Sequence, residues 1–297
     1  MAHPTSIALF HGDVGQVRLD LARPEPPLGV PVHAIEETPQ RMTAEIYQIA
    51  FISLLAFASG AINAAVGGGG LVTVPGLFAT YPDALPAALL GTDKASAIFG
   101  HISAMRHYAL RMPLPWRLIG LAAAAAFVGS YLGAHTVYSF PREWVRPLVI
   151  ALMGVMFVYT LVRRDLGKHG EAEPATRLRQ AVGIGIACLI GFYDGFFGPG
   201  TGSFLVFLFV RVFRFDFLRA TACAKVANLA ADSGAVVYFL PAGAIVWKLA
   251  IPMAASAYLG GLVGARLVMM GGNVWIRRVF LALSATLLVK LTLDYFI

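Results

Sequence analysis

The chain has 297 residues, of which 58% are hydrophobic and 13% are charged, and its mean hydropathy is +0.72. A soluble domain carries about 25% charged residues, so this chain is predicted to be an all-α, polytopic membrane protein rather than a soluble one. The net charge of +7 comes from Lys and Arg between apolar runs, which favours membrane topology over nucleic-acid binding as its explanation. Cys188 and Cys223 both lie inside apolar runs without metal-binding spacing, so we expect no metal and no cofactor.

Residues 1–44 differ from the rest of the chain, because they combine several prolines and scattered charges with no helical period. No charged segment followed by an apolar core is present, so this stretch is not predicted to be a signal peptide. We interpret it as a disordered N-terminal tail. An alternative is that Met42 is the true start, since the membrane pattern begins directly after it.

Ten apolar runs follow the tail, five in each half of the chain. They cover about 46–66, 70–81, 84–105, 116–138, 145–162, 180–197, 202–213, 217–239, 244–268 and 276–297. A helix that spans a bilayer needs ~20 residues, so the second run of each half is too short to cross alone. Each short run follows a glycine stretch, at 67–70 and at 198–202. The first two runs of each half therefore predict a broken helical hairpin with an irregular turn at membrane depth.

The two halves are copies of one another. Residues 47–166 shifted by 131 fall on 178–297 without a gap, so that Gly60 aligns with Gly191 and Lys94 with Lys225. Duplicated hydrophobic chains are typical of transporters whose site lies between the halves. The predicted organisation is therefore a tail at 1–44, a first membrane repeat at 45–163, a linker at 164–178 and a second repeat at 179–297.

The distribution of Lys and Arg predicts that the two repeats have opposite orientations in the membrane. With the linker 163–179 in the cytoplasm, fourteen Lys and Arg residues fall on the cytoplasmic side, namely Arg106, Arg111, Arg117, Arg163, Arg164, Lys168, Arg177, Arg179, Arg211, Arg214, Arg219, Arg266, Arg277 and Arg278. Only Arg142, Arg146 and Lys248 fall on the outer side. This asymmetry follows the positive-inside rule only if each half crosses the membrane an odd number of times.

Polar residues within the apolar runs are functional candidates, because each ionisable one costs at least ~2.5 kcal/mol on insertion scales. A glycine turn that opens a helix exposes backbone N–H groups at the positive end of the helix dipole, which binds oxyanions. The predicted substrate-binding residues are Asn63, Gly67, Gly68, Gly69, Gly70, Thr92, Lys94, Tyr193, Gly198, Gly200, Thr201, Gly202, Ser203, Lys225 and Asn228. The predicted proton-coupling residues are Asp93, Asp194, Asp232 and His101.

Each of these features also has a structural interpretation. Membrane glycines commonly permit close helix packing, and the aspartates could be structural hydrogen-bond acceptors. Lys94 could snorkel or pair with Asp93, but Asp93 is adjacent and faces elsewhere on a helix, and Lys225 has no adjacent acid. Two lysines expected to be unpaired at one depth favour an anion over a cation as the ligand.

Four stretches of the chain resemble the TauE/SafE family. They are GAINAAVGGGGLVTVP at 60–75, GTDK at 91–94, GFYDGFFGPGTGS at 191–203 and ATACAKVAN at 220–228. The resemblance extends over about 45–297 and implies a bacterial inner-membrane exporter of sulfite or organosulfonates. Two positions depart from the family pattern: Asp93 stands where Asn is usual, and Cys223 stands where His is frequent.

The sequence therefore predicts a secondary transporter that exports small anions by alternating access, with its site at the midplane between the repeats. No nucleotide-binding loop is visible, and no nucleophile and base recur at a workable spacing, so we expect neither ATP hydrolysis nor enzymatic activity. The alternatives are a proton or metal-cation carrier or channel, and a non-transporting membrane scaffold. The expected partners are the anion and the lipid bilayer, without nucleic acid, and a homodimer is left open.

Overall fold

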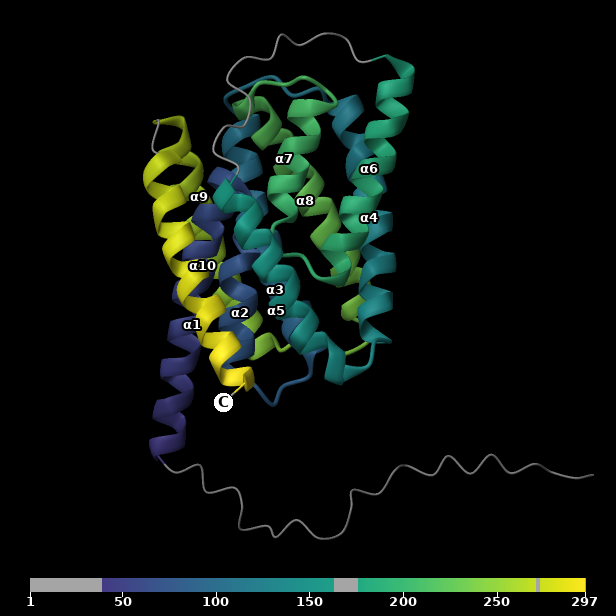
Figure 1. Cartoon of the computed structure of the whole chain (residues 1–297). Coiled ribbons are helices and arrows are strands. Elements are labelled where there is room, and N and C mark those ends of the chain that lie inside the picture. Colours follow the sequence, from purple (N-terminus) through teal and green to yellow (C-terminus); the bar gives the residue numbers. More distant parts are fainter. Residues whose placement is uncertain (1–38, 163–175, 271–272, 297) are drawn as a thin grey trace, which may run out of the picture. The chain divides into compact units, whose positions relative to one another are not determined.

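The computed structural model describes residues 39–162, 176–270 and 273–296, and within these ranges it contains ten helices and no strand (Figure 1). The first half of the chain forms α1 (Pro39–Val66), α2 (Gly70–Thr80), α3 (Pro86–Ala109), α4 (Trp116–Tyr138) and α5 (Arg142–Val162). The second half forms α6 (Arg177–Phe196), α7 (Thr201–Arg211), α8 (Phe217–Phe239), α9 (Trp247–Met269) and α10 (Asn273–Phe296). The predicted all-α class is confirmed, and each apolar run corresponds to one helix.

The predicted tail and linker lie largely outside the described residues, as do Arg163, Arg164 and Lys168. Their described ends are helical, because α1 begins at Pro39 and α6 begins at Arg177. The linker end is fixed locally by the Thr176 side chain, which accepts a hydrogen bond from the backbone N–H of Arg179 as an N-cap.

Three helices are long and apolar enough to cross a membrane by length and composition, at Thr43–Ala65, Trp116–Tyr138 and Trp247–Met269. Their lipid-accessible faces carry large apolar side chains such as Leu54, Leu132 and Leu259. An apolar exterior of this kind is stable in hydrocarbon and unstable in water. The protein is a polytopic membrane protein.

The two short helices belong to hairpins that turn back within the bundle. An 11-residue helix is about 16 Å long, roughly half the hydrocarbon thickness of a bilayer. In Figure 1, α2 returns toward the end of the bundle from which α1 comes, and α7 returns toward the end at which α6 begins. α1 and α6 run in opposite directions in this view.

The interhelical contacts of glycines recur between the halves in a reciprocal way. A Cβ atom on Gly60 of α1 would meet the Ala257 backbone of α9, and a Cβ atom on Gly191 of α6 would meet the Ala126 backbone of α4. The two pairs interchange under the shift of 131, because Gly60 becomes Gly191 and Ala126 becomes Ala257. The same exchange relates Gly129, packed on Cys188, to Gly260, packed on Phe57. Reciprocal contacts of this kind are what a two-fold axis between the halves would produce.

The Lys- and Arg-rich loops gather at one end of the bundle. The loops after α3 and α7 and the C-terminal end of α9 lie at the end where α6 begins, and the loops after α2, α4 and α8 lie at the opposite end (Figure 1). Each half thus has a hairpin with a short second helix, followed by three long helices.

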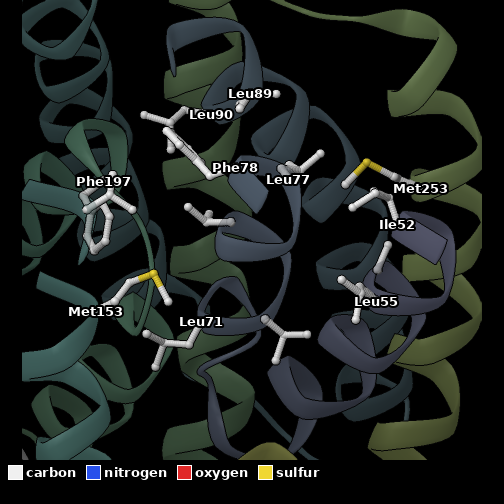
Figure 2. Packing of buried hydrophobic residues seen from close by; sticks show 14 of the residues in the cluster. Ile52, Leu55, Leu71, Leu77, Phe78, Leu89, Leu90, Met153, Phe197 and Met253 are labelled. Atoms are coloured by element: carbon white, nitrogen blue, oxygen red, sulfur yellow. The ribbon is translucent and has the colours of Figure 1, made fainter. Parts of the chain in front are cut away.

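The short helices are enclosed by the long ones. Leu71, Leu77 and Phe78 of α2 pack within a buried cluster that Ile52 of α1 and Met253 of α9 also enter (Figure 2). Lipid tails are as apolar as these side chains, so close packing rather than the hydrophobic effect holds the hairpin in place. The enclosed position of α2 fixes the turn at its start near the centre of the bundle.

Candidate functional site

The two glycine turns meet each other at the centre of the bundle. A Cβ atom on Gly67, whose φ is 79°, would lie 2.7 Å from the backbone N of Ser203, and one on Gly202 would lie 2.6 Å from the Cα of Gly67. The Ser203 hydroxyl donates a hydrogen bond to the Gly67 carbonyl over 3.2 Å. Only glycine permits this close contact of two backbones together with the positive φ.

Side chains from the long helices support the irregular turns. The Asn63 Oδ1 atom of α1 accepts a hydrogen bond from the Gly69 N–H over 3.2 Å, and the Tyr193 hydroxyl of α6 donates to the Pro199 carbonyl over 2.7 Å. These bonds satisfy backbone groups that the broken helices leave without partners at membrane depth. Asn63 and Tyr193 therefore stabilise the shape of the turns.

A small polar cavity of about 30 Å³ lies where the turns meet. It is lined by the predicted residues Asn63, Gly67, Gly70, Asp93, Lys94, His101, Asp194, Gly198, Gly200, Thr201, Gly202, Asn228 and Asp232. The lining also includes Ser59, Thr73 and Ala97, which are not among the predicted substrate-binding or proton-coupling residues. In this conformation the cavity has room for water or a small ion.

Six predicted site residues do not line the cavity: Gly68, Gly69, Thr92, Tyr193, Ser203 and Lys225. Thr92 illustrates why, because its hydroxyl donates to the Ala88 carbonyl over 2.6 Å and accepts from the Val246 N–H over 2.9 Å. Thr92 thus connects α3 to the loop before α9. Ser59 was missed, although it lies one helical turn before Asn63 and therefore on the same face of α1.

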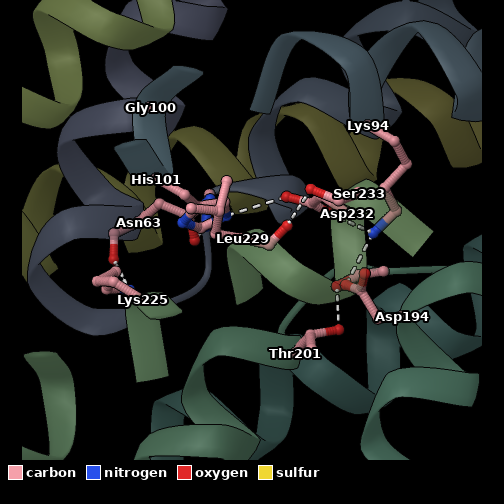
Figure 3. Close-up of polar contacts among 12 residues, drawn as sticks. Asn63, Lys94, Gly100, His101, Asp194, Thr201, Lys225, Leu229, Asp232 and Ser233 are labelled. Carbon is pink, nitrogen blue, oxygen red and sulfur yellow. Dashed lines mark hydrogen bonds and ion pairs between the residues drawn. The ribbon is translucent and has the colours of Figure 1, made fainter. Parts of the chain in front are cut away.

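Lys94 forms ion pairs with two carboxylates of the other half (Figure 3). Its Nζ atom lies 2.7 Å from Oδ1 of Asp194 and 3.1 Å from Oδ1 of Asp232. The His101 Nε2 atom lies 3.2 Å from the second carboxylate oxygen of Asp232. The expectation that both lysines would be unpaired is therefore wrong for Lys94. Its partners lie more than 90 residues away in the sequence and belong to α6 and α8, so local spacing could not reveal them.

Lys225 has a different environment. Its side chain is fully buried, and its ammonium group donates a hydrogen bond to the backbone carbonyl of Asn63. α1 ends at Val66, so the Asn63 carbonyl belongs to the last turn of that helix, where carbonyls lack intrahelical partners and the helix dipole is negative. Lys225 thus caps the C-terminal end of α1 and does not face the cavity.

The two lysine contacts are also reciprocal. Lys94 reaches from α3 to Asp194 on α6, and Lys225 reaches from α8 to Asn63 on α1. The shift of 131 converts each pair into the other. His101 and Asp232 occupy equivalent positions and contact each other, as residues on a two-fold axis do.

The charges around the cavity are asymmetric. The first half contributes Asp93, which lines the cavity together with Thr73, while the equivalent position in the second half is Ala224. Among the described residues, buried polar atoms without a hydrogen-bond partner include Nδ2 of Asn228, Nδ1 of His101 and Oδ2 of Asp194. A small polar ligand could therefore find both donors and acceptors here.

No group of three or more His, Cys, Asp or Glu side chains within the described ranges could hold a metal ion. Asp194 and Asp232 lie together, but Lys94 stands between them as their counter-charge. Cys188 and Cys223 are free thiols on separate helices.

Comparison with known proteins agrees with this architecture. Residues 52–291 match the family described as "Sulfite exporter TauE/SafE". The "Probable membrane transporter protein" of Haemophilus influenzae is 33% identical over 250 residues, which cover 83% of this chain and 95% of that protein. YfcA of Escherichia coli K12 is 34% identical over 248 residues, which cover 82% of this chain and 88% of YfcA. YunE of Bacillus subtilis is 26% identical over 235 residues, which cover 71% of this chain and 85% of YunE. Both YfcA and YunE also carry the name probable membrane transporter protein.

No solved structure gives a significant match. The family match spans both hairpins, the cavity between them and most of the long helices, and the relatives match over most of their own length. The chain belongs to the TauE/SafE family of membrane transporters.

Proposed function

We propose that this transporter exports small anions, such as sulfite, organosulfonates or related organic anions, by alternating access around the cavity between its two halves. The observation that carries the proposal is the meeting of two half-helices at one cavity. α2 begins at Gly70 and α7 begins at Thr201, and both residues line it. The first turn of a helix has unpaired N–H groups and about half a positive charge, which favours anions.

The buried amide of Asn228 supports the same assignment. Its side chain is 3% exposed, it lines the cavity, and its Nδ2 donor has no hydrogen-bond partner in the described part of the chain. An unpaired buried donor is costly, and an oxyanion would satisfy it. Glycines at 67, 198, 200 and 202 would let the ligand approach the backbone closely.

The size of the cavity supports alternating access. A cavity of about 30 Å³ has the volume of about one water molecule, so an organic sulfonate does not fit into it. The hairpins must therefore separate before such a ligand can enter. Movement of one half relative to the other around the turns would open the site to each side in succession.

An anion that crosses the membrane without a proton can be driven outward by the membrane potential. In a cell whose interior is negative, moving one negative charge outward releases ~2.3 kcal/mol per 100 mV. The sequence shows no nucleotide-binding loop, so this driving force or a coupled ion supplies the energy.

A cation carrier is the second candidate, because three carboxylates line the cavity. Asp93, Asp194 and Asp232 outnumber the single lysine there, Lys94. A cation would compete with Lys94 for Asp194 and Asp232, which favours the anion.

A ligand screen by thermal shift tests the proposal on the purified protein. We expect sulfite or a sulfonate to stabilise the wild type, by about 2.7 kcal/mol at a concentration of one hundred times Kd. Asn228→Leu should lose most of this shift, because the donor to the anion is removed. The matched control is Ser233→Ala on the same helix, where the hydroxyl donates a hydrogen bond to the Leu229 carbonyl of its own helix. Stabilisation by sodium or divalent cations alone would contradict the anion assignment and favour the second candidate.

We further propose that the protein lies in the bacterial inner membrane with its Lys- and Arg-rich end in the cytoplasm. Single cysteines introduced as Pro113→Cys and Asp83→Cys, in a background with Cys188 and Cys223 replaced by alanine, should react from opposite sides. A membrane-impermeant maleimide added to intact spheroplasts should label the Asp83→Cys variant only. Labelling of the Pro113→Cys variant instead would reverse the proposed orientation.

A further inference from the structure

The ion pairs of Lys94 form a chain that crosses the centre of the molecule. From His101 the chain continues through Asp232 and Lys94 to Asp194, with successive separations of 3.2, 3.1 and 2.7 Å (Figure 3). It joins α3 of the first half to α6 and α8 of the second. A buried lysine that is already paired with two carboxylates is not free to bind an anion.

Lys94 is nevertheless the lysine that an anion in this cavity would meet. It lines the cavity, whereas Lys225 is fully buried and directed at the α1 carbonyl. An ammonium group has three donors, and Asp194 and Asp232 occupy two of them. An anion on the third donor would add a second unbalanced negative charge to the membrane interior, so one carboxylate must be displaced and neutralised when the anion binds.

We propose that the anion displaces Asp194 from Lys94 while Asp194 takes up a proton, so that one proton accompanies each monovalent anion and transport is electroneutral. This inference rests on the proposed anion transport and specifies its coupling. An electroneutral carrier is not driven by the membrane potential, so export then requires an outward gradient of the anion that exceeds the inward gradient of protons. The proton binds to the Asp194 carboxylate on the side where the anion enters and leaves with the anion on the other side.

The charge balance follows from the ion pairs. In the empty site, Lys94 contributes one positive charge and Asp194 and Asp232 contribute two negative charges. In the loaded site, Asp194 is neutral, and the anion and Asp232 supply the two negative charges. The site thus has the same net charge empty and loaded, so the membrane interior never holds an additional charge.

Asp194 is the better proton acceptor of the two partners of Lys94. The Oδ2 atoms of both carboxylates lack a hydrogen-bond partner among the described residues, but Asp232 also has His101 Nε2 at 3.2 Å, whereas Asp194 has Lys94 as its ion-pair partner. Asp194 also lies near the end of α6, just before the turn that opens α7, so movement of that hairpin would separate it from Lys94.

The groups that face Asp194 come from four helices. Lys94 of α3 and Asp232 of α8 are the charged neighbours, the Thr201 side chain of α7 lies against it, and Tyr193 precedes it on α6. The other titratable groups close to this cluster are Asp93 and His101 of α3 and Lys225 of α8. Protonation of Asp194 would leave Lys94 paired with Asp232 alone.

Proteoliposomes test this coupling with labelled methanesulfonate, whose single charge does not change with pH. In the wild type, a pH difference of one unit, acidic outside, should produce about tenfold accumulation of the anion inside, as one-to-one coupling requires. A potential set by potassium and valinomycin should not change that accumulation. Accumulation that follows the potential and ignores the pH difference would overturn electroneutral coupling while leaving anion transport intact.

The Asp194→Asn variant assigns the proton to a residue, because an amide mimics the protonated carboxylate. We expect its methanesulfonate flux to become independent of the pH difference and sensitive to the potential. Asp83→Asn, in an exposed loop, should behave as the wild type. A flux in Asp194→Asn that still requires the proton gradient would overturn the role of Asp194. Absence of any anion flux in the wild type would instead count against the proposed function itself.

Discussion

Replacement of Lys94 with methionine is expected to abolish transport and to lower the free energy of unfolding by about 3–5 kcal/mol. The substitution keeps most of the side-chain volume but leaves Asp194 and Asp232 without their shared counter-charge. The side chains of these two aspartates are only 5% and 4% exposed. Breaking a buried ion pair from one side is costly because the remaining charge stays desolvated. Chemical or thermal denaturation in detergent, together with tracer uptake into proteoliposomes, measures both effects.

Two variants show whether the loss arises from the buried carboxylates. Lys248→Met removes a lysine that contacts Glu45 and is well exposed, so it should change stability by no more than about 1 kcal/mol. A triple variant, Lys94→Met with Asp194→Asn and Asp232→Asn, should recover much of the stability and none of the transport. Full stability in Lys94→Met alone would mean that the carboxylates do not depend on this lysine.

The second large effect is expected for Gly67→Ala. The positive φ of Gly67 alone costs an L-residue about 1–2 kcal/mol, and the added methyl group would also overlap the backbone of Gly202 and Ser203. Neither backbone can yield without parting the two turns. We therefore expect loss of transport and a large fall in the melting temperature.

Gly243→Ala is the matched control for this variant. Gly243 has a similar φ of 66°, but an added methyl group there meets nothing within 4 Å. It should show the cost of the backbone conformation alone and keep transport. Equal effects of the two substitutions on stability and transport would contradict the idea that contact between the turns matters.

The sequence predicted much of the fold because the signals were local or periodic. The lengths of the apolar runs separated α2 and α7 from the spanning helices, and the glycines at 67 and 198 located the turns. The shift of 131 between the halves predicted that Gly60 and Gly191 are equivalent. In the structure, these two glycines make equivalent backbone contacts.

The connections of the site were harder to predict, because they depend on which helices face each other. Lys94 pairs with Asp194 and Asp232 across the interface between the halves, and nothing in the local sequence indicates those partners. The Thr92 hydroxyl forms hydrogen bonds with backbone groups and does not line the cavity. Any threonine in a helix can form such backbone bonds, so its sequence position does not show which role it has. Ser59 became visible only once α1 and α2 were placed side by side.

The imperfect duplication has a physical consequence at the site. Equivalent positions hold Asn63 and Asp194, and a strictly symmetric site would carry two amides or two carboxylates there. The amide stabilises its turn through Gly69, whereas the carboxylate binds Lys94. One half thus supplies a fixed turn and the other supplies a partner that can titrate.

Tracer counterflow is the most direct test of a carrier that binds a small anion between its halves. Proteoliposomes loaded with unlabelled methanesulfonate or sulfite should take up the same labelled anion transiently above its outside concentration, and Lys94→Met vesicles should not. A carrier with alternating access produces this overshoot because the inner and outer pools share one site. Flux without an overshoot, or an overshoot driven by cations and not by anions, would contradict the proposed mechanism.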